Sequence, residues 1–355
     1  MTRTIWLASY PKSGNTWFRM LVANLSAKDG KPVDINDLPE RGGIASARGP
    51  FDYLTLIDSG LLTHDEIDCL RPRVYEELAR GALDDEYDKP QDAPPVRFAK
   101  VHDAYTRTPK GEPLLAGARG AQGAIVIVRD PRDVAPSLAN HHRCSIDEAI
   151  TFMSDRHGLY DAKQLRQKLP RWSGHVESWL DQTDIPVHLI RYEDMLADTL
   201  GTFRGALEFA GRPARDEAIR RAVAFTDFAE LRRQEQEKGF SETPRRPGGQ
   251  FFRRGVAGAW RDELSAEQVA RIEAAHAEMM RRLGYELASA MPKCEPMVRH
   301  PEVPPPYPPP HAGEGRVGAS KGDSPGAPAA SFEARLWRAP QDDADEINRS
   351  QVPLI

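Results

Sequence analysis

Residues 4–17 read TIWLASYPKSGNTW, a short apolar run that passes directly into a polar turn. The run over residues 4–8 is apolar and partly β-branched, which predicts a buried β-strand. After the turn, apolar residues recur at the i, i+3, i+4, i+7 spacing of one helix face: Phe18, Leu21, Val22 and Leu25. The stretch therefore predicts a strand, a tight turn and a helix.

The turn between this strand and this helix is suited to binding an anion. Backbone N–H groups at a helix N-terminus have no intrahelical partner, and the helix macrodipole is positive there. Lys12 adds a charge, Ser13 and Thr16 add hydroxyls, and Gly14 places no Cβ between backbone and anion. The order differs from the triphosphate loop G-x-x-x-x-G-K-[ST], because the lysine precedes the serine and the glycine. The alternative is an ordinary turn capped by a serine.

The composition argues against several classes of protein. The 355 residues are 40% hydrophobic and 28% charged, which is usual for a globular protein of one or two domains. A net charge of −5 argues against a general nucleic-acid binder, and the three scattered cysteines form no C-x-x-C pair. No apolar run reaches the about 18 residues of a membrane span. We therefore expect a cytoplasmic enzyme with no membrane span and no nucleic-acid partner.

A second strand is predicted over residues 96–102, which read VRFAKVH. Alternation along a strand puts Lys100 and His102 on the same face. Both lie near the carboxyl end of the strand, where open α/β sheets bind ligands. The alternative is a solvated strand end that carries two basic residues.

A third, fully buried strand is predicted over residues 124–128, AIVIV. Asp130 is suited to capping the helix that follows, with Pro131 in its first turn. Arg129 then stands at the strand end and Ser137 within the helix. A guanidinium binds a phosphate in bidentate fashion and stays charged, so Arg129 is suited to an anion. The alternative is an ion pair of Arg129 with a neighbouring aspartate.

Later segments have weaker signals. We expect a helix over residues 63–83, helical structure over 146–182 with a break at Pro170, and a strand over 185–191 that leads into Tyr192. A mobile charged loop is expected over residues 232–246. His141 and His142 are expected to be exposed residues at a helix end, since adjacent histidines share no helix face. The alternative is that they border a substrate pocket.

The last part of the chain combines a basic loop, a helix and a tail. Residues 248–261 are rich in glycine and arginine, which suits a loop that wraps a ligand. An amphipathic helix is predicted to end near Leu283. Beyond it the chain is dominated by proline, glycine and alanine, a composition that buries too little apolar surface to fold.

In this order, the motifs resemble those of the cytosolic-type sulfotransferases, which transfer a sulfuryl group from 3′-phosphoadenosine 5′-phosphosulfate (PAPS). The resemblance extends over residues 4–283 and rests on the loop at 10–17, the Lys-x-His strand, the Arg129–Ser137 pair and the Arg-Arg-Gly loop. It implies an α/β domain over residues 1–290 with a central parallel sheet flanked by helices, the P-loop-kinase-like sulfotransferase fold. Residues 291–355 are then a disordered tail.

The resemblance also implies roles for single residues. His102 is the general base, while Lys12 and Lys100 stabilise charge on the transferring group and the leaving phosphate. The 5′-phosphosulfate loop comprises Lys12, Ser13, Gly14, Asn15 and Thr16. The 3′-phosphate is held by Arg129, Ser137, Arg253, Arg254 and Gly255. The adenine lies against Trp17, Tyr192, Thr226 and Phe228.

The implied reaction moves SO₃ from PAPS to a hydroxyl or amine of a small-molecule acceptor and releases adenosine 3′,5′-bisphosphate (PAP), without a metal. Lipid, carbohydrate, phenol and peptide acceptors all stay open. The family's dimerisation segment has no match here, so the oligomeric state stays unknown. The alternatives are a kinase-like phosphoryl transferase, which needs a magnesium-binding carboxylate, and a nucleotide-binding module without catalysis.

Overall fold

The computed structural model describes residues 3–27, 30–38, 44–83, 96–161, 164–243, 250–288 and 337–338. All of them belong to one compact unit of the chain. Of the predicted tail, only β7 (Trp337–Arg338) is described, and it pairs in parallel with β4 (Leu159–Asp161). The rest of residues 291–355 lies outside the described residues, so the division at residue 290 stays a prediction.

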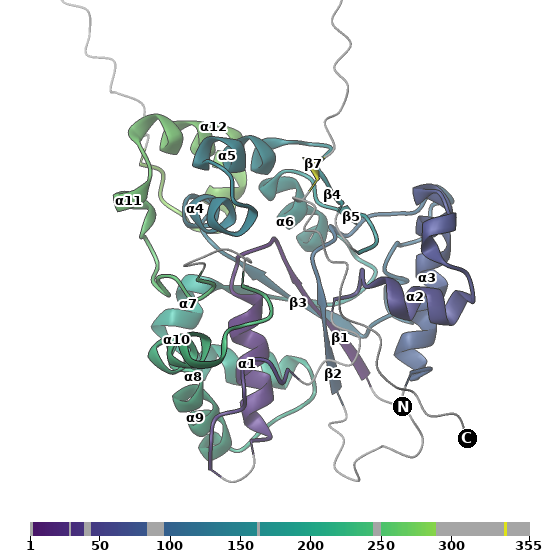
Figure 1. Ribbon diagram of the computed structural model, residues 1–355, viewed down its shortest axis with the longest axis horizontal. Coiled ribbons are helices and arrows are strands. Elements are labelled where there is room, and N and C mark those ends of the chain that lie inside the picture. The colour runs from purple at the N-terminus through teal and green to yellow at the C-terminus, as the bar shows by residue number, and fades with distance from the viewer. Residues whose placement is uncertain are drawn as a thin grey trace, which may run out of the picture. The chain divides into compact units, whose positions relative to one another are not determined.

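A four-stranded parallel sheet forms the centre of the molecule (Figure 1). Its order is β2 (Val96–Val101), β1 (Arg3–Ser9), β3 (Gly123–Val128) and β6 (Val187–Arg191). All three neighbouring pairs are parallel, so the carboxyl ends of the strands meet at one edge. The predicted α/β fold with a central parallel sheet is confirmed.

Both faces of the sheet are buried, as parallel sheets require. On β1, Ile5 and Leu7 face one apolar cluster, while Trp6 and Ala8 face another. The first cluster joins the sheet to α1 (Asn15–Leu25), α7 (Tyr192–Ala197), α8 (Thr199–Phe209) and α9 (Asp216–Phe225). The second joins it to α3 (His64–Arg80), α4 (Pro131–His142), α5 (Ile146–Ser154), α6 (Trp172–Leu180) and α12 (Ala266–Arg282).

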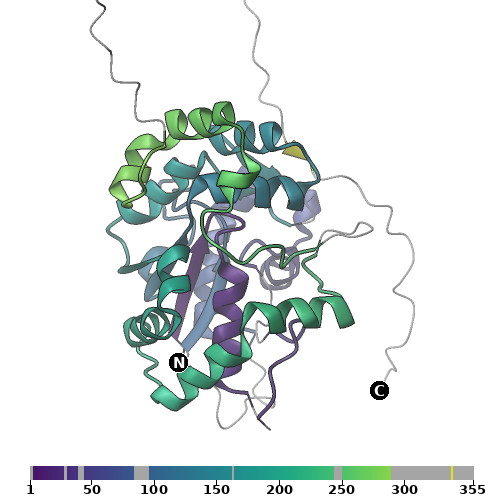
Figure 2. The same ribbon diagram turned by 90° about the vertical axis from the view of Figure 1, so that its left-hand side faces the viewer.

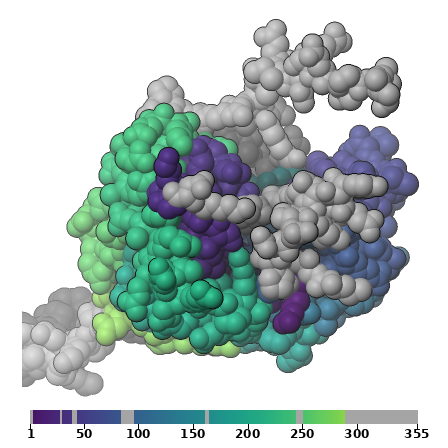
Figure 3. Space-filling model, turned by 90° about the horizontal axis from the view of Figure 1, so that it is seen from below, coloured from purple at the N-terminus to yellow at the C-terminus, as the bar shows by residue number. Residues whose placement is uncertain are grey.

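The views show the same layers. In Figure 2 the light-green helix α12 lies at the top, far from the teal-green helices below, and the purple helix α1 stands beside those lower helices. From below, the green surface of residues after 200 lies beside the purple N-terminal surface (Figure 3). The smaller elements are α2 (Arg48–Thr55), α11 (Trp260–Glu263) and the 3₁₀ turns at Ser59–Leu61 and Gly117–Arg119. No helix among the described residues is long and apolar enough to cross a membrane.

Two predictions are wrong in part. The helical stretch expected over residues 146–182 begins as α5, which ends at Ser154, and an antiparallel pair of β4 with β5 (Gln167–Lys168) follows. Gly158 permits that turn, because a Cβ there would lie 2.3 Å from the Leu169 carbonyl oxygen. The helix after the expected break at Pro170 is present as α6. The charged stretch expected to be a loop begins instead as part of α10 (Phe228–Lys238), where Arg233 pairs with acidic residues one turn away on either side.

Candidate active site

A cavity of about 1000 Å³ opens at the carboxyl ends of β1, β2 and β3. The β1–α1 turn, the end of β2, α4, α7 and residues 251–255 line it. This is the edge at which open α/β sheets bind ligands, and the predicted loop and strand-end residues meet there.

The β1–α1 turn is held open toward the cavity. Gly14 has φ +104°, and a Cβ there would lie 2.6 Å from the Tyr192 ring, so only glycine fits. No side chain caps α1, so its first N–H groups keep their capacity to bind an anion. Asn15 supports the turn from below by donating to the Leu7 carbonyl at 2.9 Å. Ser13 is fully buried and its hydroxyl has no partner among the described residues.

Lys12 lies over an aromatic ring inside the cavity. Its Nζ is 3.6 Å from the centre of the Phe251 ring. Burial lowers the pKa of Lys12 to about 7, with Lys100 and Arg129 adding to the effect and Glu242 opposing it. An anion bound beside Lys12 would therefore restore its positive charge, since an opposite charge favours the ionised form.

His102 is held in one tautomer. Its Nδ1 lies 2.7 Å from the Ser9 carbonyl oxygen, which accepts only, so Nδ1 carries the proton and donates it there. Nε2 therefore keeps its lone pair, as a general base requires. Burial and the nearby Lys100 lower the pKa of His102 to about 3, which keeps the ring neutral near pH 7.

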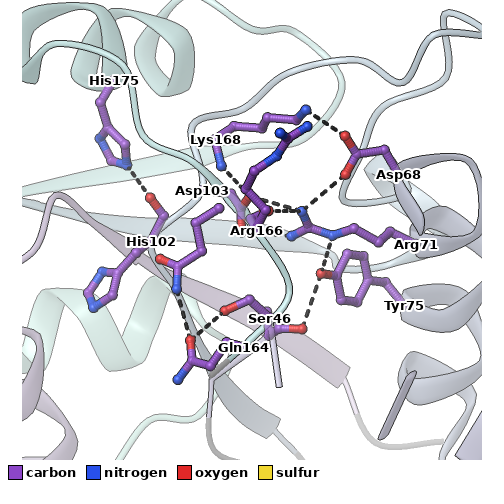
Figure 4. A network of polar contacts seen from close by, with 12 residues as sticks. Ser46, Asp68, Arg71, Tyr75, His102, Asp103, Gln164, Arg166, Lys168 and His175 are labelled. Carbon is purple, nitrogen blue, oxygen red and sulfur yellow. Dashed lines mark hydrogen bonds and ion pairs between the residues drawn. The ribbon is translucent and has the colours of Figure 1, made fainter. Parts of the chain in front are cut away.

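The backbone around His102 is fixed by a buried polar network (Figure 4). His175 Nε2 lies 3.1 Å from the His102 carbonyl oxygen. The Asp103 carboxylate accepts from both terminal nitrogens of Arg71, at 3.0 and 2.7 Å, and from the Lys168 N–H at 2.9 Å. The carbonyl group of His102 and the side chain of the next residue, Asp103, are therefore both held in place by hydrogen bonds.

A carboxylate occupies the place beside the β1–α1 turn. Glu242 accepts from the Thr16 hydroxyl at 3.0 Å and from Arg19 at 2.7 Å, and it pairs with Lys100 at 3.3 Å. Burial acts to raise the pKa of Glu242, but Lys100 and Arg19 outweigh it and hold the pKa well below its usual range. Thr16, Arg19 and Lys100 therefore already hold a carboxylate, that of Glu242.

A second basic region lies around Arg129. Its guanidinium lies 4.4 Å from the Tyr192 ring centre and donates to the Val256 carbonyl at 3.1 Å. Its buried Nε has no partner among the described residues. Ser137 lines the cavity as well. Asp133 ties the glycine-rich loop to α4 by accepting from the Gly258 N–H at 2.6 Å and from another backbone N–H.

The predicted Arg-Arg-Gly segment also reaches the cavity. Arg253 pairs with Glu263 at 2.5 Å, and Arg254 pairs with Asp262 at 3.4 Å. Gly255 has φ +66°, and a Cβ there would lie 2.2 Å from the Phe228 ring. All three predicted residues line the cavity with Arg129.

Three of the four predicted adenine contacts line the cavity. Trp17 and Tyr192 lie edge to face with ring centres 5.8 Å apart, and Phe228 lines the same cavity. Thr226 is placed differently, because its hydroxyl donates to the Ala222 carbonyl within α9 while its own carbonyl accepts from the Trp17 indole. Thr226 and Ser13 are not among the described residues that line the cavity. The binding roles of these residues stay predictions.

Several cavity residues differ from the expectation. His141 and His142 are largely buried instead of exposed at a helix end, and they line the cavity, which was the alternative for these two residues. Arg19 and Glu242 were missed, although Arg19 lies one helical turn after Asn15 on α1. Phe251, Gln164 and Gln167 had no local signal, since their positions depend on segments far along the chain. Among the residues that the structure describes, no cluster suited to a metal ion occurs, and the lack of a metal requirement stays a prediction.

Comparisons with known proteins agree on one family. A family model described as a sulfotransferase domain matches residues 117–284. The chain is 23% identical to mouse Sulfotransferase 2B1 over 281 residues, covering 78% of this chain and 71% of that protein. It is 25% identical to the luciferin sulfotransferase of Photinus pyralis, covering 76% of this chain and 69% of that protein.

Solved structures that resemble the chain include proteins complexed with PAP. Mouse sulfotransferase SULT7A1 complexed with PAP matches with a TM-score of 0.48 at 20% identity, covering 79% of this chain and 85% of that one. Retinol dehydratase in complex with androsterone and PAP matches with a TM-score of 0.47 at 21% identity, covering 78% and 80%. Residues 117–284 thus match a sulfotransferase domain, and the named curated relatives, at 23% and 25% identity, are sulfotransferases.

Proposed function

We propose that the cavity binds PAPS and that the chain transfers its sulfuryl group to a hydroxyl or amine of a small-molecule acceptor. The observation that carries the proposal is the presence of two basic regions in one cavity. One region comprises Lys12 of the β1–α1 turn, Arg19 of α1 and Lys100 of β2, while Arg129 and the residues of the Arg-Arg-Gly loop lie elsewhere on the cavity wall. PAPS carries its anions at two ends, a 5′-phosphosulfate and a 3′-phosphate, with an adenine that suits the rings of Trp17, Tyr192 and Phe228.

In the proposed reaction, the acceptor oxygen forms a bond to sulfur as the bond from sulfur to the bridging oxygen breaks. His102 Nε2 takes the acceptor proton, and PAP leaves with the electron pair of the broken bond. Lys12 and Lys100 are suited to stabilising the charge that grows on the bridging oxygen. The Ser9 contact supports this role for His102, because it leaves Nε2 as the basic nitrogen.

The low pKa of His102 without ligand is compatible with general-base catalysis. Burial and Lys100 lower it, and the donor would bring several negative charges to the same cavity. Negative charge favours an imidazolium, so donor binding raises the pKa of His102 toward the range useful for catalysis. The base would then be strongest when the donor is in place.

We expect PAP to stabilise the protein more than adenosine 5′-phosphate, which lacks only the 3′-phosphate. At about a hundred times its dissociation constant, PAP adds roughly 2.7 kcal/mol to the free energy of unfolding. Thermal unfolding with each nucleotide, and with ATP, measures the difference. Arg129→Gln should reduce the shift caused by PAP, while Arg220→Gln, at an exposed position on α9, should not. Equal shifts with PAP and adenosine 5′-phosphate would contradict the assignment of a 3′-phosphate site.

We also expect Glu242→Gln to tighten PAP binding by about tenfold or more. Glu242 holds Arg19, Lys100 and Thr16, the groups that we assign to the donor, so the donor has to displace it. A hydrogen bond to a charged group contributes about 1.5–3 kcal/mol, which sets the expected gain. Isothermal titration calorimetry with PAP gives the dissociation constant.

Glu237→Gln is the matched control, because Glu237 is exposed and pairs only with Arg233 among the described contacts. Its dissociation constant for PAP should equal that of the unchanged protein. Weaker binding by Glu242→Gln would show that this carboxylate supports the donor site instead of competing for it.

A further inference from the structure

One wall of the cavity takes no part in the donor site proposed above. It comprises six residues, which we call the acceptor wall: Ile44, His141, His142, Tyr160, Gln164 and Gln167. Successive contacts connect it. The rings of His142 and Tyr160 lie 5.1 Å apart, Tyr160 pairs with Gln167 across β4 and β5, and Gln167 donates to Gln164 at 2.8 Å. At its far end, Ile44 forms a bridge with Lys100 on β2, two residues before His102.

The acceptor wall is polar but carries no formal charge near pH 7. Burial and the nearby Lys12 lower the pKa of His141 to about 2, and the same causes lower the pKa of His142 to about 4. Burial raises the pKa of Tyr160, so its phenol stays protonated. Gln164 and Gln167 are amides and Ile44 is apolar. A cationic acceptor would therefore find no carboxylate on this wall.

Gln167 presents a fixed hydrogen-bond acceptor. Gln164 Oε1 accepts from the Ser46 hydroxyl at 2.8 Å and from Gln167 Nε2 at 2.8 Å, so the nitrogen of Gln167 faces Gln164. Gln167 is only 3% exposed, and its Oε1 is buried with no partner among the described residues. A buried acceptor without a partner costs about 1–3 kcal/mol, which a ligand hydroxyl would recover.

His141 adds a second group of the same kind. It lies at the end of α4, with its ring 6.4 Å from the Phe251 ring and 5.3 Å from His142. Its Nδ1 is buried and has no partner among the described residues. A neutral imidazole offers one donor and one acceptor, and a hydroxyl can satisfy either. Tyr160 and Phe251 meanwhile provide aromatic faces for the C–H groups of a ring.

We propose that the acceptor is a neutral polyhydroxylated molecule of the carbohydrate type, bound along the acceptor wall with one hydroxyl at His102. This proposal rests on the proposed function, since it names the acceptor of that same reaction. A flat apolar phenol leaves Gln167 Oε1 and His141 Nδ1 without partners, and sites built to hydrogen-bond a substrate discriminate strongly against analogues that lack the hydroxyl. The bound hydroxyl gives its proton to His102 as its oxygen bonds to sulfur and PAP departs.

The test compares two acceptor probes with ³⁵S-labelled PAPS: maltotriose, a neutral polyol, and 2-naphthol, an apolar phenol. We expect kcat/KM for maltotriose to exceed that for 2-naphthol by at least tenfold. Gln167→Leu should lower kcat/KM for maltotriose by about tenfold and change that for 2-naphthol by less than twofold. Gln122→Leu, at an exposed position near the opposite end of β3, is the matched control and should change neither.

PAP binding, measured separately by calorimetry, distinguishes the two proposals. Failure to bind PAP overturns the proposed function. Normal PAP binding with a preference for 2-naphthol overturns the carbohydrate assignment alone. If neither probe is sulfated, maltotriose is titrated into the PAP-saturated protein. Binding that Gln167→Leu weakens supports the assignment, and absence of binding overturns it.

Discussion

Replacing Arg71 with methionine should lower the free energy of unfolding by about 3–5 kcal/mol, the cost of leaving a buried charge without its partner. Arg71 is fully buried, and it donates to Asp103 through two nitrogens and to the Tyr75 hydroxyl at 2.8 Å. Asp103 is also fully buried, so its carboxylate would lose the guanidinium without gaining water. Equilibrium unfolding in urea measures the change.

Arg73→Met on the same helix is the matched control. Its side chain is 64% exposed and pairs with Glu76 and Glu77, so its loss should cost less than about 1 kcal/mol. In the double variant Arg71→Met/Asp103→Asn, the amide can still accept from the Lys168 N–H, and no unpaired charge remains. The double variant should therefore be less destabilised than the sum of the single variants. Equal costs for Arg71→Met and Arg73→Met would contradict the role of this ion pair.

The local parts of the fold could be predicted from the sequence. The strand at 4–8, the turn into α1 and the capped helix after Asp130 depend on neighbouring residues, and the structure confirms these elements, with Asp130 accepting from the Arg132 N–H. The Lys-x-His pattern also placed Lys100 and His102 in one cavity, because strand alternation and the polarity of parallel sheets determine it.

The remainder depends on contacts between distant segments. Arg71 reaches Asp103 across 32 residues, and Glu242 reaches Thr16 across 226. Neither pairing leaves a local pattern, because charged residues are exposed in most proteins and the sequence does not mark the few that are buried. His141 was misplaced for the same reason: its burial comes from segments packed over the end of α4, which helix periodicity cannot reveal.

His102→Ala should lower kcat by about 10²–10⁴-fold, the usual contribution of a positioned general base. The dissociation constant for PAP should stay nearly unchanged, because His102 donates to Ser9 and we assign it no contact with the donor. Steady-state rates with any accepted substrate and calorimetry with PAP measure the two quantities. His157→Ala, at an exposed position after α5, is the control and should affect neither.

Lys12→Ala should differ from His102→Ala in its effect on donor binding. Lys12 would contact the phosphosulfate in both the ground state and the transition state, so its loss should weaken PAP binding and lower kcat together. His102→Ala should lower kcat alone, and the two variants should therefore fail in different ways. If His102→Ala turned over normally, His102 would not be the base. His141 and His142 would then be the next candidates, because they are the other histidines that line the cavity among the described residues.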